Sequence, residues 1–305
     1  MINGFAIILE NDILYCSNEQ YYSSFEIILF CEKLITSINP KGNWRLRSIF
    51  LKGYRMTAER VLIHHYRLEN GKNLFYCLSG DFSVGSEIAE KVLVEFQEKI
   101  KSYYDNPNIL EQASAKPIFK EIVEAATDYL WDKYEDDLED EKKIVPEPDP
   151  SISNNLLYTG ISHQRLPIIS QLYSKILLEN LNKEVNEENV ELYSSNLSAK
   201  LATISMNTII RAKTSIKEII IQDIESDLKY LIFFGVINDY SIDFFGSGNY
   251  VQIQKVFQNF MEYISKDEVL HKEFAGDLKP YKHLHDSIKQ FYESGLWSLN
   301  LILNT

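Results

Sequence analysis

The order of elements in this chain is set by its opening stretch, GFAIILENDILYC, at residues 4–16. Its two apolar runs, at residues 4–9 and 13–16, flank a polar turn of three residues. Apolar runs of this length on either side of a short polar turn are typical of a β-hairpin. The sequence therefore predicts that the chain begins with two antiparallel strands.

The first half continues with strands and helices in a regular order. We expect strand, strand, helix, three strands and a helix, at residues 4–9, 13–16, 25–38, 45–52, 58–68, 73–78 and 86–103. The first helix is apolar nearly all round and should be deeply buried. In the second helix, Ile88, Val92, Phe96 and Ile100 recur every four residues, a stripe that packs on a sheet. A sheet with helices on both faces is therefore predicted.

A further helix is expected at residues 116–134. Its apolar side chains are spaced three or four apart and share one side of the helix, namely Ile118, Ile122, Ala126, Tyr129 and Leu130. We expect this side of the helix to pack against the rest of the first half.

The second half repeats the order with different residues. Its strands and helices are expected at residues 156–162, 166–173, 196–211, 216–224, 228–237, 240–245 and 250–264. A glycine-bearing turn precedes the last helix of each half, at residues 78–85 and 245–250. The repeat predicts a pair of sheets with helical faces.

An acidic, proline-containing stretch separates the two halves. Residues 131–150 hold nine acidic residues against three lysines, and they end in three prolines. Like-charge repulsion and proline both favour an extended, poorly packed chain. We therefore predict a first domain at residues 1–134, a linker at residues 135–155 and a second domain at residues 156–305.

The opposite charge gathers at residues 41–67, which hold seven basic residues against one acidic residue. The arginines that would form a partner-binding basic patch are Arg45, Arg47, Arg55, Arg60 and Arg67. Side chains two apart on a strand share a face, so Arg45 and Arg47 are predicted to lie together.

Two interpretations of the basic patch remain open. Charged residues protect a sheet edge against pairing with another strand, and they also bind anionic partners such as an acidic protein face or a lipid headgroup layer. Nucleic acid is disfavoured as a partner, because the chain carries a net charge of −13. The neighbouring His64 and His65 point to opposite faces of their strand, which is a poor geometry for a shared metal.

Composition and missing motifs narrow the class of function. The apolar runs fall far short of the roughly 20 residues that a membrane helix needs, and the chain opens without a basic leader. The three cysteines, Cys16, Cys31 and Cys77, are expected to be buried reduced thiols. Phosphate-loop, dinucleotide-binding, HExxH, CxxC and GxSxG patterns are all missing. We expect a cytoplasmic protein without catalytic, cofactor or metal sites.

The histidines leave one enzymatic alternative open. His283 and His285 with Asp286 form a short HxHD pattern that some metal hydrolases place on a strand. Residues 280–292 read as helical, however, and side chains two apart on a helix do not face each other. Surface histidines are the simpler interpretation. An enzyme with an unrecognised motif would use His163, or the pair His283 and His285, as its working groups.

In element order, the first half resembles the longin-type domains of trafficking SNAREs, adaptor small subunits and tethering complexes, and more distantly the roadblock proteins. The residues that carry the resemblance are the hairpin at residues 5–16, the buried helix at residues 25–38 and the block at residues 73–103. The second half resembles these domains over about 110 residues. The resemblance implies an α+β fold of two longin-like domains, each a five-stranded antiparallel sheet flanked by helices (β-β-α-β-β-β-α).

The resemblance also implies a function, because such domains assemble complexes and recruit or regulate Ras-like GTPases on membranes. We therefore expect a non-catalytic scaffold that binds a Ras-like small GTPase or another longin or roadblock protein, as a dimer or a hetero-complex with peripheral contact to an anionic membrane. The alternatives are the histidine-centred enzyme and a signalling adaptor with another class of partner. The apolar tail at residues 296–303 would close over the second domain's core or form a partner-binding helix.

Overall fold

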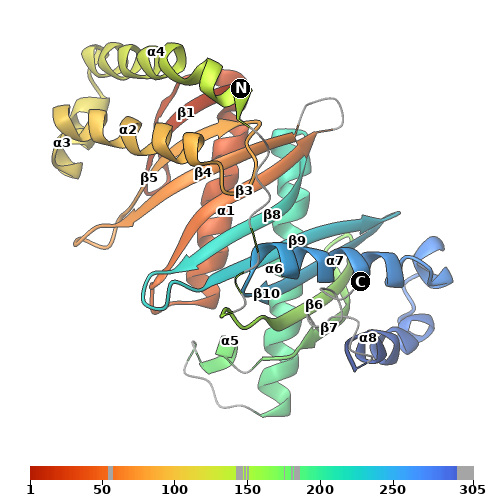
Figure 1. Cartoon of the computed structure of the whole chain (residues 1–305). Coiled ribbons are helices and arrows are strands. Elements are labelled where there is room, and N and C mark those ends of the chain that lie inside the picture. Colours follow the sequence, from red (N-terminus) through yellow and green to blue (C-terminus); the bar gives the residue numbers. More distant parts are fainter. Residues whose placement is uncertain are drawn as a thin grey trace. The chain divides into compact units, whose positions relative to one another are not determined.

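The computed structural model describes residues 1–53, 58–141, 147, 149, 151–174, 176–179, 181 and 186–293 (Figure 1). By its internal contacts the chain divides into two compact units. The first unit consists of Met1–Lys33, Arg45–Pro146 and Thr208–Ser215, and the second of Leu34–Trp44, Glu147–Asn207 and Ile216–Thr305. Each unit therefore contains a segment from the other half of the sequence.

The elements follow the predicted order in both halves. The first half consists of β1 (Ile2–Leu9), β2 (Asp12–Cys16), α1 (Tyr22–Ile38), β3 (Trp44–Gly53), β4 (Ala58–Arg67), β5 (Asn73–Gly80), α2 (Glu87–Tyr103), α3 (Pro107–Ser114) and α4 (Pro117–Asp140). The second half consists of β6 (Asn155–His163), β7 (Leu166–Leu172), α5 (Ile176–Glu179), α6 (Glu187–Ala212), β8 (Thr214–Asp223), β9 (Lys229–Ile237), β10 (Tyr240–Ser247), α7 (Tyr250–Ile264) and α8 (His283–Glu293).

Two helices are longer than their patterns predict. Helix α6 begins at Glu187 instead of residue 196, because its first two turns are largely exposed and have no apolar stripe to mark them. Helix α4 continues to Asp140, so the first acidic residues of the predicted linker are helical. Of the rest of that linker, residues 142–146, 148 and 150 lie outside the described residues.

The predicted fold class of two separate five-stranded sheets is wrong. The strands form one ten-stranded antiparallel sheet in the order β2-β1-β5-β4-β3-β8-β9-β10-β6-β7. Each half contributes five strands in the same internal order, so the repeat of elements is present without the separation into two sheets. Alternation along a strand reports which faces are buried, but it does not report whether an outer edge faces solvent or another strand. The number of sheets could not be derived from the pattern.

In the first unit, α2 and α4 cover one face of the strands and α1 covers the other (Figure 1). The core under α2 and α4 is built from buried apolar side chains of both layers, including Phe5, Ile7, Tyr76, Leu78, Phe96, Val123 and Leu130. On the other face, Ser24 of α1 donates a hydrogen bond to the Glu59 carboxylate of β4 (3.2 Å). Strand β4 is therefore covered by a helix on each face, and successive side chains along it point toward different helices.

In the second unit, α7 and α8 cover one face of the strands and α6 covers the other. Thr159 of β6 shares a hydrogen bond with Tyr292 of α8 (2.9 Å). The adjacent Tyr158 points the other way, and its hydroxyl lies near Ser198 of α6. One face of β6 therefore contacts α8 and the other contacts α6.

Some predicted features lie outside the described residues, namely Arg55 and the apolar tail at residues 296–303. Among the helices that the structure describes, none combines the length and the apolar character that crossing a membrane requires. The three cysteines are free, and Cys31 and Cys77 are buried as predicted, whereas Cys16, near the open end of the hairpin, is only partly buried.

Candidate functional site

The arginines of the predicted basic patch are dispersed in the part of the chain that the structure describes. Arg60 is only 4% exposed, because its guanidinium lies over the Phe50 ring (4.9 Å to the centroid) and donates to Ser48 (3.1 Å). Arg67 is exposed at the end of β4. Arg60 is therefore a packing residue, while Arg67 is available at the surface.

Arg45 and Arg47 do not share a face as predicted. Arg47 forms an ion pair with Glu90 of α2 (3.4 Å), whereas the charge of Arg45 interacts with that of Glu32 in α1. The pairing of β3 with β4 begins only at Ser48. Two residues earlier, the backbone N–H of Leu46 donates to the His65 ring (3.3 Å). Regular alternation therefore does not hold at this end of β3.

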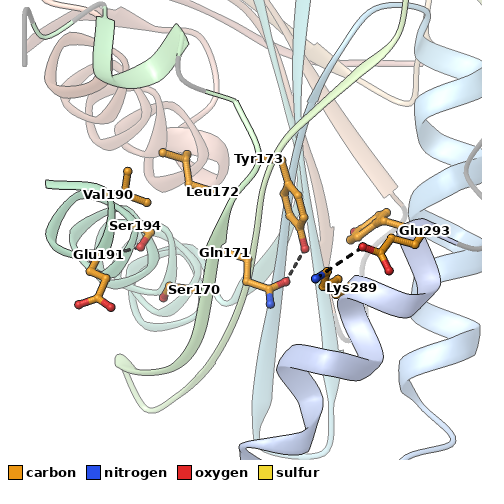
Figure 2. A pocket seen from close by; sticks show the side chains of 10 residues that line it. Ser170, Gln171, Leu172, Tyr173, Val190, Glu191, Ser194, Lys289 and Glu293 are labelled. Atoms are coloured by element: carbon orange, nitrogen blue, oxygen red, sulfur yellow. Dashed lines mark hydrogen bonds and ion pairs between the residues drawn. The ribbon is translucent and has the colours of Figure 1, made fainter. Parts of the chain in front are cut away.

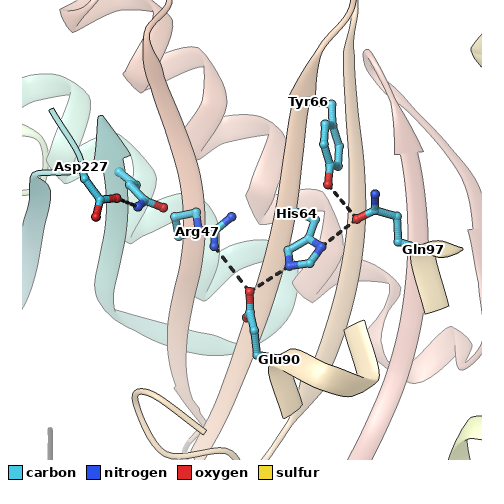
Figure 3. A network of polar contacts seen from close by, with 7 residues as sticks. Arg47, His64, Tyr66, Glu90, Gln97 and Asp227 are labelled. Atoms are coloured by element: carbon cyan, nitrogen blue, oxygen red, sulfur yellow. Dashed lines mark hydrogen bonds and ion pairs between the residues drawn. The ribbon is translucent and has the colours of Figure 1, made fainter. Parts of the chain in front are cut away.

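Arg47 belongs to a polar network between the sheet and α2 (Figure 3). One carboxylate oxygen of Glu90 contacts Arg47 and also lies 2.9 Å from Nε2 of His64. The other ring nitrogen of His64 lies 2.8 Å from the Gln97 side-chain oxygen, which also accepts a hydrogen bond from Tyr66 (2.7 Å). Five side chains from three elements are joined in one chain of contacts.

The network fixes α2 on the strands. His64 is 7% exposed, and both of its ring nitrogens face oxygen acceptors, so an imidazolium would donate to Glu90 and Gln97 at once. Arg47 and Glu90 are both partly exposed, and such an ion pair contributes about 0–1 kcal/mol. The buried histidine therefore anchors α2, and the arginine closes the network at the surface.

His65 lies on the other face of β4, in contact with α1. Its Nδ1 accepts the N–H of Leu46, so the proton is on Nε2, which donates to Asn73 (3.0 Å). Burial lowers the pKa of His65 to about 4, with smaller contributions from the nearby charges of Arg45 and Arg67 and an opposing one from the hydrogen bond to Asn73. The ring is therefore neutral near pH 7 and adds no positive charge to the patch.

The outward side of α2 and α4 carries an apolar groove, which we call the α2–α4 groove. Four large apolar side chains stand exposed along it, Val94 by 40%, Tyr103 by 62%, Ile118 by 53% and Tyr129 by 46%. One part of the groove has a volume of about 410 Å³ and is lined by Tyr103, Ile118, Ile122 and Tyr129, among others. The α2–α4 groove is thus a candidate site for a protein partner.

Charges around the α2–α4 groove compensate one another. Lys99 lies over the Tyr129 ring at 4.0 Å from its centroid, and Lys133 lies over the same ring at 5.5 Å. Both lysines are also close to Glu95, at 3.9 Å and 2.7 Å respectively. The rim is therefore polar but close to neutral, which suits an uncharged apolar contact better than an anionic one.

The predicted inward side of α4 was wrong at Ile118 and Tyr129. The helix buries a different stripe, namely Phe119, Val123, Ala126, Thr127, Leu130, Tyr134 and Leu138. These residues are also spaced three or four apart, so two overlapping stripes compete on one helix. The stripe with Phe119 and Tyr134 is the one that packs, and it leaves the other at the surface.

The histidines of the enzymatic alternative bond to different partners. His283 lies 2.8 Å from a carboxylate oxygen of Asp267, His285 lies 2.9 Å from the Gln171 amide, and His163 lies against aromatic rings. In the ranges that the structure describes, no group of three or more His, Cys, Asp and Glu side chains is placed to hold a metal ion.

The second unit contains a pocket of about 580 Å³ along strand β7 (Figure 2). Residues 170–172 of the strand and Tyr173 after it form its floor. Val190 and Ser194 of α6 line one side, and Lys289 and Tyr292 of α8 line the other. The pocket is therefore a trough between two helices with a strand along its length.

A cluster of unpaired polar groups lies buried beside this pocket. Both carboxylate oxygens of Asp243 lack a hydrogen-bond partner among the described residues, and burial raises the pKa of this side chain to about 8. The hydroxyls of Tyr158, Ser170 and Ser198 lie near one another and likewise have no hydrogen-bond partner in the ranges that the structure describes. Tyr158 lies across Gly160, where an added Cβ would be 2.8 Å from the Cζ atom of the ring.

Comparison with known proteins gives no assignment. No protein family model matches the chain, and no curated protein matches it in a sequence search. The longin and roadblock resemblance therefore stays a prediction that rests on element order. Function has to be argued from the surfaces and the side chains themselves.

Two features of these sites have signals in the sequence that the pattern analysis did not use. Asp243 is a lone acidic residue inside an apolar strand, which marks either a mistaken strand or a buried carboxyl. The stretch from Pro117 to Asp140 carries more apolar residues than one helix side can bury. An excess of this kind indicates that some apolar side chains will be exposed.

Proposed function

We propose that the protein is a non-catalytic interaction scaffold that binds a Ras-like small GTPase or a second longin- or roadblock-like protein. The α2–α4 groove carries the proposal, because four large apolar side chains are exposed on two adjacent helices. Contiguous apolar surface of this kind is typical of protein-binding sites. The doubled order of elements supports the class of partner, since it is the feature shared with longin-type domains.

The groove suits the apolar face of a partner's helix. A trough between two helices accepts side chains from an amphipathic helix at positions three and four apart. Tyr103 and Tyr129 are rigid anchors of the type enriched in binding hot spots. Fully burying an exposed large apolar side chain contributes about 1.5–3 kcal/mol. The four side chains of the groove are about half exposed, so each would contribute about half of that amount, against the cost of association.

The proposal places the scaffold in the cytoplasm, at the surface of an anionic membrane where Ras-like GTPases act. Arg67 supports this placement, because it is exposed and lies near the charge of Arg45. Arg47 contributes less, since it is paired with Glu90.

Binding to purified partners tests the proposal. The full chain is immobilised and exposed to a panel of Ras-like GTPases, each loaded with GDP or with a GTP analogue, and to purified longin and roadblock proteins. Ile118→Asp and Tyr129→Asp each place a charge in the α2–α4 groove, and we expect each to weaken binding about 30-fold, equivalent to about 2 kcal/mol. The matched control is Leu278→Asp in the second unit, which charges an apolar residue of similar exposure (45%).

Two outcomes would overturn the proposal. One is that no member of the panel binds, and the other is that a partner binds equally well to both groove variants and to the control. Arg67→Glu tests the basic patch separately, because Arg67 can be changed without breaking the network that holds α2. A loss of membrane or partner binding with Arg67→Glu would assign a role to the patch.

A further inference from the structure

A row of three residues crosses the strands of the second unit. Asp243 of β10 and Ser170 of β7 both lie opposite Gly160 of β6 in the strand register. Residues that lie directly opposite each other in antiparallel strands point to the same face, with Cβ atoms about 4.5–5.5 Å apart. The Asp243 and Ser170 side chains therefore stand on either side of the space above Gly160.

The Tyr158 hydroxyl occupies the space above Gly160. Tyr158 lies two residues before Gly160 on the same face of β6, and a Cβ added at Gly160 would collide with its hydroxyl oxygen. Ser198 lies near the same hydroxyl and belongs to α6, the helix that covers this face, and the charge of Asp243 also acts on it. The missing side chain at Gly160 thus brings oxygens from three strands and one helix together.

These oxygens are buried and lack hydrogen-bond partners in the part of the chain that the structure describes. Asp243, Tyr158 and Ser198 are each 0% exposed. Both carboxylate oxygens of Asp243 and the hydroxyl oxygens of Tyr158, Ser170 and Ser198 are unpaired there. Burying a polar group without a partner costs free energy, which a bound group in contact with it recovers. Unpaired oxygens that converge on one space therefore indicate a bound group that the polypeptide itself does not supply.

The chemistry of these atoms favours a small cation with a single charge. Carboxylate and hydroxyl oxygens are hard ligands, which suit hard cations better than they suit anions or soft metals. A single positive charge neutralises the one carboxylate, that of Asp243, whereas a divalent ion would leave a net charge buried at high cost. Water molecules alone would pair with the hydroxyls but leave the charge of the carboxylate unbalanced.

We propose that Asp243, Tyr158, Ser170 and Ser198 form a binding site for an alkali-metal cation, sodium or potassium, inside the second unit. The carboxylate would balance the charge of the ion, and the three hydroxyls would bind it from β6, β7 and α6. When each bond is about 2.3–2.6 Å long, the ligand oxygens of one ion lie about 3–5 Å apart. Side chains that project from adjacent strands toward one point can meet this spacing.

The pocket along β7 borders this cation site. Ser170 lines the pocket from β7, and Ser194 lines it from α6 (Figure 2). Ser194 and Ser198 are four residues apart on α6, so they lie on the same side of the helix. One ligand of the proposed site and the neighbour of another therefore line the pocket, through which an ion would enter.

Urea denaturation of the full chain in different salts tests the proposal. Choline chloride, sodium chloride and potassium chloride are compared at about 0.3 M and at one pH, 8.5, so that the salts differ only in their cation. An ion that binds only the folded chain raises the ratio of folded to unfolded protein by a factor of 1 + [ion]/Kd. We expect sodium or potassium chloride to raise this ratio at least 10-fold over choline chloride in the unmodified chain, and less than 2-fold in Asp243→Asn. In choline chloride, Asp243→Asn should be the more stable protein, because its buried side chain carries no charge.

Glu59→Gln is the matched control, because Glu59 is also a buried carboxyl (3% exposed) but accepts hydrogen bonds from Ser24 and Ser79. It should keep the full response of the unmodified chain to sodium or potassium. Ser198→Ala, which removes one ligand of the ion, should reduce the response. The ion itself is detected by ²³Na NMR, in which the unmodified chain should broaden the sodium signal and Asp243→Asn should not.

Three outcomes would overturn the proposal. One is an equal response to the salts in the unmodified chain and in Asp243→Asn, and another is no response to either salt, which would leave water as the occupant of the cluster. The third is a larger response to calcium chloride at equal ionic strength, because it would assign the site to a divalent ion.

Discussion

Replacing Asp243 with asparagine, which cannot ionise, is expected to raise the free energy of unfolding by an amount that depends on pH. Asp243 is fully buried, its oxygens lack partners among the described residues, and burial raises its pKa from 3.8 to about 8. In Asp243→Asn the side chain keeps its shape and stays neutral at every pH. The comparison of the two proteins therefore isolates the cost of keeping this carboxyl buried.

The direction follows from linkage between proton binding and folding. Because the pKa of Asp243 is raised in the folded state, the folded protein holds a proton that the unfolded chain releases above about pH 4. The stability that the protonated group provides is complete at low pH and is lost as the pH rises to about 8. At 1.36 kcal/mol per pKa unit, the loss is about 3 kcal/mol at pH 6, about 4 kcal/mol at pH 7 and about 6 kcal/mol above pH 8.

Urea denaturation of both proteins at pH 6, 7, 8 and 9 measures this effect. These conditions stay away from the isoelectric point near 5.0, where the protein is least soluble. All other titrating groups are common to both chains and cancel in the difference. We expect the stability advantage of Asp243→Asn to grow by about 2 kcal/mol between pH 6 and pH 8 and then to level off.

A constant difference between the two proteins from pH 6 to pH 9 would refute the reasoning. It would mean that the Asp243 carboxyl keeps one protonation state throughout, either because it is ionised with a partner or because its pKa lies outside the range. A decrease with rising pH would refute the sign, since it would require a carboxylate that stabilises the folded state.

Three further predictions concern side chains in or against the core. Gly160→Ala should lower the free energy of unfolding by about 1–3 kcal/mol in urea denaturation, because its Cβ would overlap the buried Tyr158 ring; an unchanged value would show that the ring can move aside. In an NMR titration His65 should have a pKa near 4, so that up to about 3 kcal/mol of stability is lost as the pH falls from about 6.5 to about 4; a pKa near 6.5 would contradict its burial. Glu90→Ala should cost about 1–2 kcal/mol in thermal or urea unfolding, because it removes an acceptor from His64, whereas the exposed Glu98→Ala control should cost less than about 0.5 kcal/mol.

The sequence predicts elements well where one period dominates. Residues 250–264 match α7 at both ends, because Asn249 caps the helix and a single apolar stripe runs through it. It predicts less where two patterns overlap, as on α4, where the stripe with Phe119 buries and the stripe with Ile118 does not. The face on which a side chain lies also cannot be predicted where the pairing of two strands becomes irregular, which is why Arg45 and Arg47 contact different helices.

Sites depend on contacts that no local pattern contains. In the network at His64, the ring contacts Gln97 and Glu90 of α2, which lie 33 and 26 residues further along the chain. The spacing of these residues in the sequence does not predict the contact. The place of β7 at the end of the strand order is likewise a property of the whole sheet. The position of a strand within the sheet is known only when all ten strands have been placed.

The repeat itself shows that the fold does not require a carboxyl at the position of Asp243. In the second half, Gly160 lies between Asp243 of β10 and Ser170 of β7 in the strand register. In the first half, Ala6 lies four residues before a turn residue of positive φ, as Gly160 does, and its register neighbours are Cys77 of β5 and Cys16 of β2.

The same row therefore holds two thiols in one half and a hydroxyl and a carboxyl in the other. A buried thiol is a small apolar group, and burial raises the pKa of Cys77 so that it stays neutral. Replacing it with a carboxyl costs about 4 kcal/mol at pH 7, a large part of the 5–15 kcal/mol that typically stabilises a domain. Since a thiol fits at the equivalent position of the first half, the fold does not need a carboxyl there, and packing alone does not account for Asp243. The free energy that burying this carboxyl costs therefore marks Asp243, Gly160 and Ser170 as the place where the second half departs from what the fold requires.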